Sequence, residues 1–349
     1  MQIIDRTKPV IITGGTGYVG SQVVARFLEE GLTVHAAVRH PENRNSVRHL
    51  DELAKRSPGK IRFFKADLLA PGTYDEAMAG CELVIHSASP FLLHVKDPQK
   101  ELVEPALKGT KNVLGSVNRT SSVKRVVLTS SVAAIIGDAK DCLAFPNGSA
   151  TEENWNTSSS LMHQPYSYSK TVAEQMAWEI CRAQSRWDLV TINPSFVMGP
   201  AIALSSASES LATVRQFGNG RMKQGAPDFA IGVVDVRDVA EAHFRAAFTP
   251  EASGRYIVSA ENTDFITLAG YLRQAFGNTY PFPSRVLPKW LVWLAAPAAG
   301  FSRKMARLNL GYPWKADNSK SIRELGMTYR SADESVTALF RQLAESKSI

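Results

Sequence analysis

The chain has 349 residues, of which 44% are hydrophobic, so it can bury one large core, or a large core and a smaller one. Its net charge of +7 is modest, and Lys and Arg occur without a block of five or six, which argues against a nucleic-acid groove. The three cysteines are far apart and in no metal-binding pattern, which favours buried thiols in a reducing compartment. The first eight residues are polar and form no secretory signal, so we expect a cytoplasmic protein.

A glycine-rich turn follows the first apolar segment. Val10–Ile12 is β-branched and apolar, as a strand buried on both faces requires, and a helix is predicted from the turn to about Glu30. Three glycines between them have the spacing that allows a tight turn, close approach of the backbone to a pyrophosphate, and close packing of helix on strand. The free N–H groups of the helix would face phosphate. We assign to this dinucleotide site Gly14, Thr16, Gly17, Tyr18, Val19 and Gly20.

The end of the second predicted strand, Thr33–Val38, indicates which dinucleotide binds. Arg39 stands there, where a cofactor with a free ribose 2′-hydroxyl would favour Asp or Glu. A guanidinium instead suits a 2′-phosphate, and Arg44 and Arg48 are nearby. The sequence therefore favours NADP(H) over NAD(H), with an ordinary solvated arginine as the alternative.

Three more strands are predicted at Ile61–Ala66, Leu83–His86 and Arg125–Leu128. In such folds ligands lie at the carboxyl ends of the strands. We therefore assign to the cofactor site the residues that follow the first two of these strands, which are Asp67 and Leu68 near the adenine and Ser87, Ala88 and Ser89 near the ribose and nicotinamide. The third strand ends in Thr129-Ser130-Ser131, which places hydroxyl groups at the same edge.

Two segments flank this edge. Glu101–Val117 has helical spacing, and for Asn112 within it we prefer a helix-packing role to the positioning of a relay water. Residues 138–165 are polar and broken by Pro146 and Gly148, which predicts a loop over the site with Trp155 as its one large anchor.

A helix predicted from Tyr166 to about Gln184 carries the residues for chemistry. A spacing of four puts Tyr166 and Lys170 on one face of it. Hydride transfer to a carbonyl leaves charge on oxygen, so a proton must be delivered. The Lys170 ammonium would stabilise the Tyr166 phenolate, lower the phenol pKa and bind the nicotinamide ribose, while Ser131 holds the carbonyl oxygen. Tyr168 is the rival phenol, but no lysine lies four residues after it.

The alternation of strands and helices continues through Leu189–Asn193, and a last strand is predicted near Tyr256–Ser259. This alternation of strands and helices implies an α/β fold with a Rossmann-type doubly wound parallel sheet of about seven strands and a smaller, mainly helical C-terminal lobe. We expect residues 1–200, with 226–262 returning, to bind the nucleotide, and residues 201–225 and 263–349 to bind substrate. The apolar run Trp290–Phe301 is too short to span a bilayer, and it favours a pocket-lining helix over a membrane-surface helix.

These features together resemble the extended short-chain dehydrogenase/reductases, specifically the group of dihydroflavonol reductases, cinnamoyl-CoA reductases and microbial aldehyde and ketone reductases. The resemblance covers about residues 9–260 and rests on residues 13–20, 38–39, 65–68, 86–90, 129–131, 166–170, 193–195 and 199–200. It implies that Ser131, Tyr166 and Lys170 are the catalytic triad and that Arg39 holds the 2′-phosphate. It also implies nicotinamide contacts from Pro194, Ser195 and Val197, and we assign to the substrate pocket Phe91, Ser131, Tyr166 and Phe196.

The sequence thus predicts a reductase that transfers hydride from NADPH to a ketone or aldehyde with a bulky apolar or aromatic body. We expect no metal, no nucleic-acid partner and no membrane span, and a monomer or homodimer. A 3β-hydroxysteroid or sterol-type dehydrogenase is the alternative, suggested by Trp290–Phe301. A nucleotide-sugar epimerase usually prefers NAD, which Arg39 disfavours, and a non-catalytic NADP-sensing protein would need no triad.

Overall fold

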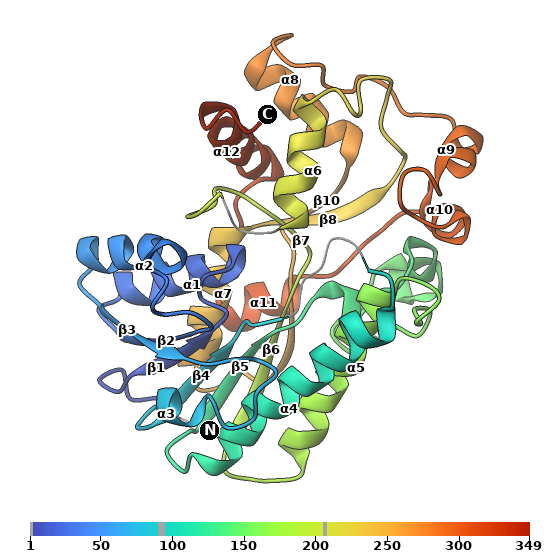
Figure 1. Ribbon diagram of the computed structural model, residues 1–349. Helices are drawn as coiled ribbons and strands as arrows, with labels where there is room; N and C mark the ends of the chain where they lie inside the picture. Colours follow the sequence, from blue (N-terminus) through green and yellow to red (C-terminus); the bar gives the residue numbers. More distant parts are fainter. Residues whose placement is uncertain (1–2, 90–94, 205–207) are drawn as a thin grey trace.

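The computed structural model describes residues 3–89, 95–204 and 208–349. A seven-stranded sheet in the order β3-β2-β1-β4-β5-β6-β9 forms the lower part of the molecule (Figure 1). All neighbouring strands in it are parallel. Its strands are β1 (Val10–Thr13), β2 (Thr33–Val38), β3 (Lys60–Lys65), β4 (Leu83–His86), β5 (Arg125–Thr129), β6 (Asp188–Pro194) and β9 (Gly254–Val258). The predicted Rossmann-type sheet is confirmed.

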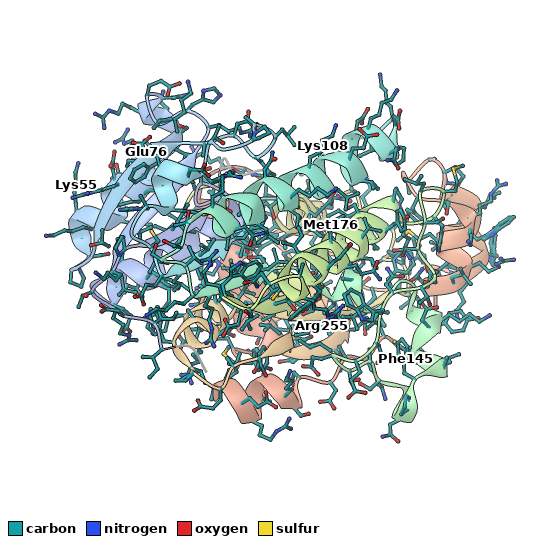
Figure 2. The ribbon with its side chains drawn as sticks, turned by 90° about the horizontal axis from the view of Figure 1, so that it is seen from below. Lys55, Glu76, Lys108, Phe145, Met176 and Arg255 are labelled. Atoms are coloured by element: carbon teal, nitrogen blue, oxygen red, sulfur yellow. The ribbon has the colours of Figure 1, made fainter. Side chains whose placement is uncertain are left out.

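Helices cover both faces of this sheet, because its inner strands are apolar on both sides. On one face α1 (Tyr18–Glu29) packs against α7 (Val236–Phe248) and α2 (Arg44–Arg56). On the other face α4 (Glu104–Arg119) packs against α5 (Pro165–Arg182), and the two run side by side in the view from below (Figure 2). The short helix α3 (Asp75–Met78) and a π-helical turn at Gln99–Val103 complete this face.

A second lobe lies above the carboxyl ends of these strands (Figure 1). It contains a three-stranded sheet, in the order β10-β8-β7, packed with helices around its own core of Phe217, Leu272 and Phe340. Its elements are β7 (Phe196–Met198), β8 (Ala230–Asp235), β10 (Glu261–Asp264), α6 (Glu209–Gly218), α8 (Phe265–Phe276), α9 (Lys289–Ala295), α10 (Arg303–Asn309) and α12 (Ala332–Glu345).

The structure differs from the sequence-based division of the chain at two places. Residues 226–262 are expected from the sequence to return to the large sheet, but β8 within them pairs with β7 and β10 of the small sheet. The chain returns to the large sheet only with α7, which begins at Val236. Helix α11 (Ser319–Leu325) packs against α7 and β9, so part of the segment 263–349 belongs with the nucleotide-binding sheet. The assignment of the two lobes to cofactor and substrate stays a prediction.

The apolar run Trp290–Phe301 forms α9 and the turn after it. Within α9 only Val292 is buried; it packs, together with Ala296 just after the helix, against α10. The four large side chains Trp290, Leu291, Trp293 and Leu294 are 68%, 37%, 42% and 54% exposed, so they do not line an enclosed pocket as expected. These side chains stay exposed because α9 has only seven residues and packs on its neighbours through the single side that carries Val292. In the part of the chain that the structure describes, no helix is long and apolar enough to cross a membrane.

Candidate active site

The glycine turn between β1 and α1 has the geometry that its spacing predicts. Gly14 has φ +70°, and a Cβ there would lie 2.7 Å from backbone atoms of Ala88. A Cβ at Gly20 would lie 2.1 Å from the Gly14 carbonyl oxygen, so this position packs the helix on the turn. Gly17 is exposed, and a Cβ there would make an ordinary contact of 3.4 Å with the Gly14 carbonyl oxygen. Among the described residues no side chain caps α1, so the N–H groups of its first turn are available to an anion.

Two further assigned cofactor residues differ in what they offer. Tyr18 is buried and its hydroxyl donates to the Gly199 carbonyl oxygen at 2.6 Å, so its side chain joins the turn to the second lobe. Only its backbone N–H is left for a cofactor. Ser195, just after β6, is buried, and its Oγ has no hydrogen-bond partner among the described residues. An unsatisfied hydroxyl at this edge fits the predicted nicotinamide contact.

Arg39 lies exposed at the end of β2, and no ion pair with it is found among the described residues. Its neighbours are less available, because Arg48 pairs with Glu52 at 2.8 Å and Arg44 lies 3.7 Å from Asp51. The guanidinium of Arg39 is therefore open to an anion, and its predicted contact with the 2′-phosphate stays a prediction.

The adenine end of the predicted site is formed by the chain after β3. The Asp67 carboxylate accepts the Leu69 N–H at 2.9 Å and is otherwise open to solvent. Asn112 donates from Nδ2 to the Leu68 carbonyl oxygen at 2.9 Å, which fixes α4 to this segment. The predicted packing role of Asn112 is confirmed.

Lys170 joins the catalytic helix to the nucleotide-binding edge. Its Nζ donates to Ser89 Oγ at 2.9 Å, after β4, and lies 5.8 Å from the centre of the Tyr166 ring. Burial lowers the pKa of Lys170 to about 8, and the Glu174 carboxylate opposes that shift.

The structure does not bear out the expected depression of the Tyr166 pKa. Desolvation, followed by the Glu209 carboxylate, raises the pKa of Tyr166 to about 12. Tyr166 is 41% exposed, so water moderates this rise. The phenol is protonated at neutral pH.

The two serines after β5 have different roles. Ser131 caps the 3₁₀ turn Val132–Ala134, which packs against α5. Its Oγ accepts the Ala133 N–H at 3.1 Å, which leaves the hydroxyl hydrogen free to donate to a substrate oxygen. Ser130 is buried and donates to the Glu174 carboxylate in a short contact. Ser131 is thus the serine available for chemistry.

A buried carboxylate beneath these groups is a feature that the sequence analysis missed. Glu174 accepts from Arg255 Nε on β9 at 2.6 Å and from Asn193 Nδ2 on β6 at 2.8 Å. The Arg255 guanidinium carbon lies 3.9 Å from the centre of the Trp155 ring, which explains how that residue anchors its loop. The available signal was the position of Glu174 one turn after Lys170 on the same helix face.

A second buried cluster holds the segment just before α5. Asp138 is hydrogen-bonded to His163 Nε2 at 2.7 Å and accepts from Gln164 Nε2 at 2.5 Å. Asn309, at the end of α10, donates to the same carboxylate at 2.6 Å. Gln164 adopts a left-handed conformation with φ 51° and directly precedes α5. The start of the catalytic helix is therefore fixed to the second lobe.

Four of the predicted residues, Leu68, Ala88, Ser89 and Lys170, line a small cavity of about 30 Å³ together with Glu174. Ser131 and Tyr166 are not among the described residues that line it. His86, also in the lining, is hydrogen-bonded to Thr13 Oγ1 at 2.9 Å, and burial lowers its pKa to about 3, so it is neutral beside the Lys170 ammonium. Phe196 packs on the core of the second lobe, and Phe91 lies outside the described residues.

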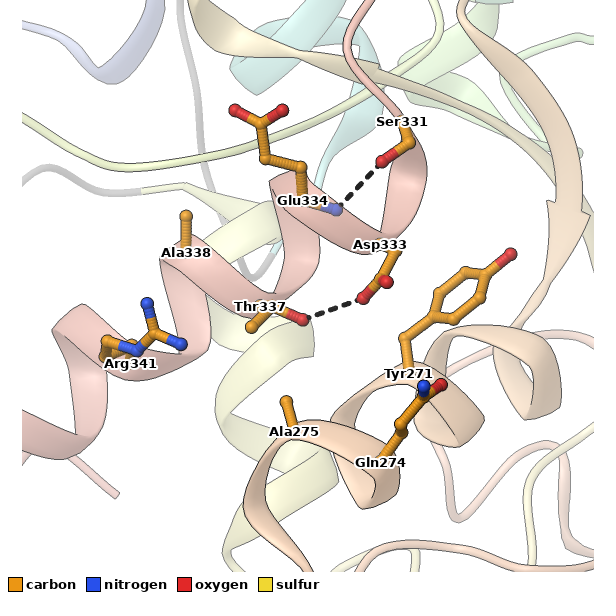
Figure 3. Close-up of a pocket in the computed structure, with 9 residues that line it drawn as sticks. All are labelled: Tyr271, Gln274, Ala275, Ser331, Asp333, Glu334, Thr337, Ala338 and Arg341. Atoms are coloured by element: carbon orange, nitrogen blue, oxygen red, sulfur yellow. Dashed lines mark hydrogen bonds between the residues drawn. The ribbon is translucent and has the colours of Figure 1, made fainter.

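A larger open groove of about 410 Å³ lies between α8 and α12 (Figure 3). It holds none of the predicted site residues. Its polar groups bond to one another, as Thr337 does to Asp333 at 3.1 Å and the Glu334 N–H to Ser331 Oγ at 3.1 Å. We assign it no role in the reaction.

Comparisons with known proteins found relatives in both sequence and structure. Residues 10–259 match the model of the NAD dependent epimerase/dehydratase family. The cinnamoyl-CoA reductase CAD2 of Medicago truncatula is 38% identical over 283 residues, which cover 80% of this chain and 82% of the relative. Tetraketide alpha-pyrone reductase 1 of Arabidopsis thaliana is 34% identical over 350 residues, covering 98% of this chain and 97% of the relative.

Among solved structures, the yeast methylglyoxal/isovaleraldehyde reductase Gre2, complexed with NADPH, has a TM-score of 0.79 and 25% identity to this chain. The similarity covers 97% of this chain and 99% of that one.

Proposed function

The chain belongs to the NAD dependent epimerase/dehydratase family, as an extended short-chain dehydrogenase/reductase of the dihydroflavonol and cinnamoyl-CoA reductase group, and is therefore an NAD(P)-dependent oxidoreductase. We propose that it reduces a ketone or aldehyde carbonyl on a bulky apolar or aromatic substrate. The cofactor is NADP(H), which is supported by the exposed Arg39 and by the NADPH complex of the similar yeast reductase.

NADPH, when bound, supplies the hydride. The remaining chemistry belongs to the side chains at the carboxyl edge of the sheet. The Ser131 hydroxyl donates a hydrogen bond to the carbonyl oxygen, and Tyr166 delivers the proton to it as negative charge develops. A phenol whose pKa lies above neutrality is in the acid form that this step needs. The nearby Lys170 ammonium stabilises the phenolate left behind.

The placement of Lys170 is the observation that carries this proposal. One helical turn separates it from Tyr166, and its Nζ reaches Ser89 on the segment that follows β4. One cation therefore connects the proton donor with the place where the nucleotide ribose is expected. A chain that only sensed NADP(H) would have no use for a phenol at this position.

The test compares two tyrosines two residues apart on α5. Tyr166→Phe keeps the ring and removes the proton donor, so turnover with a panel of aldehydes and ketones, followed as NADPH consumption, should fall by about two to four orders of magnitude. NADPH affinity should change little. Tyr168→Phe is the matched control and should retain turnover. Normal turnover in Tyr166→Phe together with an inactive Tyr168→Phe would contradict the assignment.

A further inference from the structure

Helix α9 presents an apolar surface to solvent. Trp290, Leu291, Trp293 and Leu294 stand at positions i, i+1, i+3 and i+4, which share one side of a helix, and all four are exposed. We call these four residues the tryptophan face. Ala295 and residues 297–300, just after it, are also exposed. An apolar surface of this kind on the outside of a protein marks an interaction site.

The tryptophan face is held rigidly in place. Val292 and Ala296, on the opposite side of the helical segment, are buried against Ala306 and Leu310 of α10. Phe301 packs edge-on against Phe229 at 5.7 Å between ring centroids and closes this small core. The exposure of the four large side chains is therefore fixed by the pairing of α9 with α10.

The net charge of the chain equals the charge of the sequence segment that contains this face. Residues 265–316 contain no Asp or Glu and seven Lys or Arg, a number equal to the net charge of +7. The 33 other Lys and Arg balance the 33 Asp and Glu of the remaining chain. The seven are Arg273, Arg285, Lys289, Arg303, Lys304, Arg307 and Lys315.

The basic groups lie directly beside the tryptophan face. Lys289 opens α9, and α10 carries Arg303, Lys304 and Arg307. The Arg303 guanidinium carbon lies 4.7 Å from the centre of the Trp293 ring, so a cation covers one edge of the apolar surface. The one acidic contact in the described residues is Asp228, 4.0 Å from Lys289. Tryptophan and leucine flanked by Lys and Arg form the pattern of a helix that lies in the interface of a bilayer.

We propose that the α9–α10 hairpin docks on the surface of a lipid bilayer that contains anionic lipids. The tryptophan face would enter the boundary between headgroups and acyl chains, and the basic residues would contact the lipid phosphates. A second copy of the chain fits the surface poorly, because a symmetric dimer through it would bring the basic residues of both copies together.

The test is co-sedimentation of the full chain with phosphatidylcholine vesicles, with and without about one third phosphatidylglycerol, at low and high salt. Partition should be at least about tenfold stronger with phosphatidylglycerol and should weaken as salt rises. The double variant Trp290→Ser/Trp293→Ser, and separately Lys304→Glu/Arg307→Glu, should each lose about tenfold or more of this binding. Quenching of tryptophan fluorescence by brominated lipid should disappear in the tryptophan variant.

Controls separate docking from folding and catalysis. Ile322→Ser, at an exposed apolar position on α11, should bind vesicles as the parent does. All variants should keep their turnover with a water-soluble aldehyde, because none of these residues lines the cavity beside Ser89 and Lys170. Equal weak binding to both vesicle types would overturn the proposal, as would unchanged binding in both double variants. Concentration-dependent dimerisation that the tryptophan substitutions abolish would assign the face to a second copy instead.

Discussion

Lys170 and Glu174 stand one turn apart on α5, and the Glu174 carboxylate affects the pKa of Lys170. Lys170 is desolvated, so its pKa is lowered to about 8, and the Glu174 carboxylate limits that shift. Because a lysine with a lowered pKa is charged only below that pKa, the ammonium that supports Tyr166 is present at neutral pH and is lost as the pH rises through about 8.

The first residue-scale prediction concerns this titration. Carbonyl reduction, measured as kcat/KM against pH, should decline as the pH rises through about 8, where Lys170 loses its proton. Glu174→Gln removes the charge that raises the Lys170 pKa, so the decline should move to lower pH.

Lys170→Arg is the control for this profile, because a guanidinium stays charged throughout, and its residual activity should show no decline in this range. Glu174→Gln also leaves the buried Arg255 cation without its carboxylate, at a cost of about 3–5 kcal/mol in stability, so its unfolding curve should be measured in parallel. A parent profile that is flat through this range would contradict the assignment to Lys170.

The second residue-scale prediction concerns cofactor choice. A hydrogen bond to a charged group contributes roughly 1.5–3 kcal/mol, so Arg39→Ala should weaken NADPH binding about ten- to a hundred-fold and leave NADH binding nearly unchanged. Arg39→Asp should reverse the preference. The affinities can be measured by titration or by the shift in melting temperature with each cofactor.

Arg48→Ala is the matched control for Arg39, because its guanidinium is already paired with Glu52 at 2.8 Å. The advantage of NADPH should also shrink as salt rises, since the contact is ionic and exposed. Equal use of NADPH and NADH by the parent protein at low salt would refute the role given to Arg39.

The sequence predicted those site residues whose role depends on a local pattern. The glycines of the turn and the pair Tyr166 and Lys170 have fixed spacings, so one segment is enough to identify them. Glu174 and Arg255 are 81 positions apart and meet only because β6 pairs with β9. The raised pKa of Tyr166 could not be predicted either, since it depends on packing and on Glu209 from another helix.

At the scale of elements, Gly17 and Gly20 of the glycine turn differ in what a side chain at each position would contact. Gly20 packs the first turn of α1 against the Gly14 carbonyl, whereas Gly17 faces outward with an ordinary φ of −78°. Gly20 therefore serves the packing of the fold, whereas contact of Gly17 with the cofactor stays a prediction.

The element-scale prediction compares alanine at these two positions. Gly20→Ala places a methyl group 2.1 Å from the Gly14 oxygen, so α1 must shift, and we expect a loss of about 1–3 kcal/mol in the free energy of unfolding. Gly17→Ala should keep the stability and weaken NADPH binding, because its methyl group stands where the pyrophosphate approaches. Denaturant unfolding and cofactor titration separate the two effects. Equal stability of the two variants would show that the packing role of Gly20 is wrong.

The accuracy of the predicted elements follows from their burial. The inner strands β1 and β4 of the large sheet are fully buried, β2 is nearly so, and all three are largely apolar, so β2 and β4 match their predicted ranges. The small sheet gives no such signal. β10 is Glu-Asn-Thr-Asp, without one apolar residue, and β7 has only three residues. Their pairing is set by tertiary contacts, which override weak local preference.

At the scale of the whole molecule, the two lobes are joined along the chain that leaves β6. Tyr18 bonds to Gly199, and Gln22 Nε2 donates to the Pro200 carbonyl oxygen at 2.8 Å. Gln342 of α12 donates from Nε2 to the Ala201 carbonyl oxygen at 2.6 Å. Residues 199–201 are therefore held by hydrogen bonds from both α1 and the C-terminal helix α12. The right-handed crossover rule predicts the order of the first strands, but not these contacts.

The position of β9 at the edge of the large sheet has a consequence for synthesis on the ribosome. β6 ends at Pro194, and its partner β9 begins 60 residues later, at Gly254. At about 5–20 residues per second, the apolar edge of β6 stays unpaired for about 3–12 s. The unpaired N–H and C=O groups of such a strand edge can hydrogen-bond to strands of other chains, which leads to aggregation. Nascent chains released after residue 250 should therefore sediment as aggregates more than chains released after residue 262, which contain β9. Equal soluble fractions would mean that another part of the chain protects the edge first.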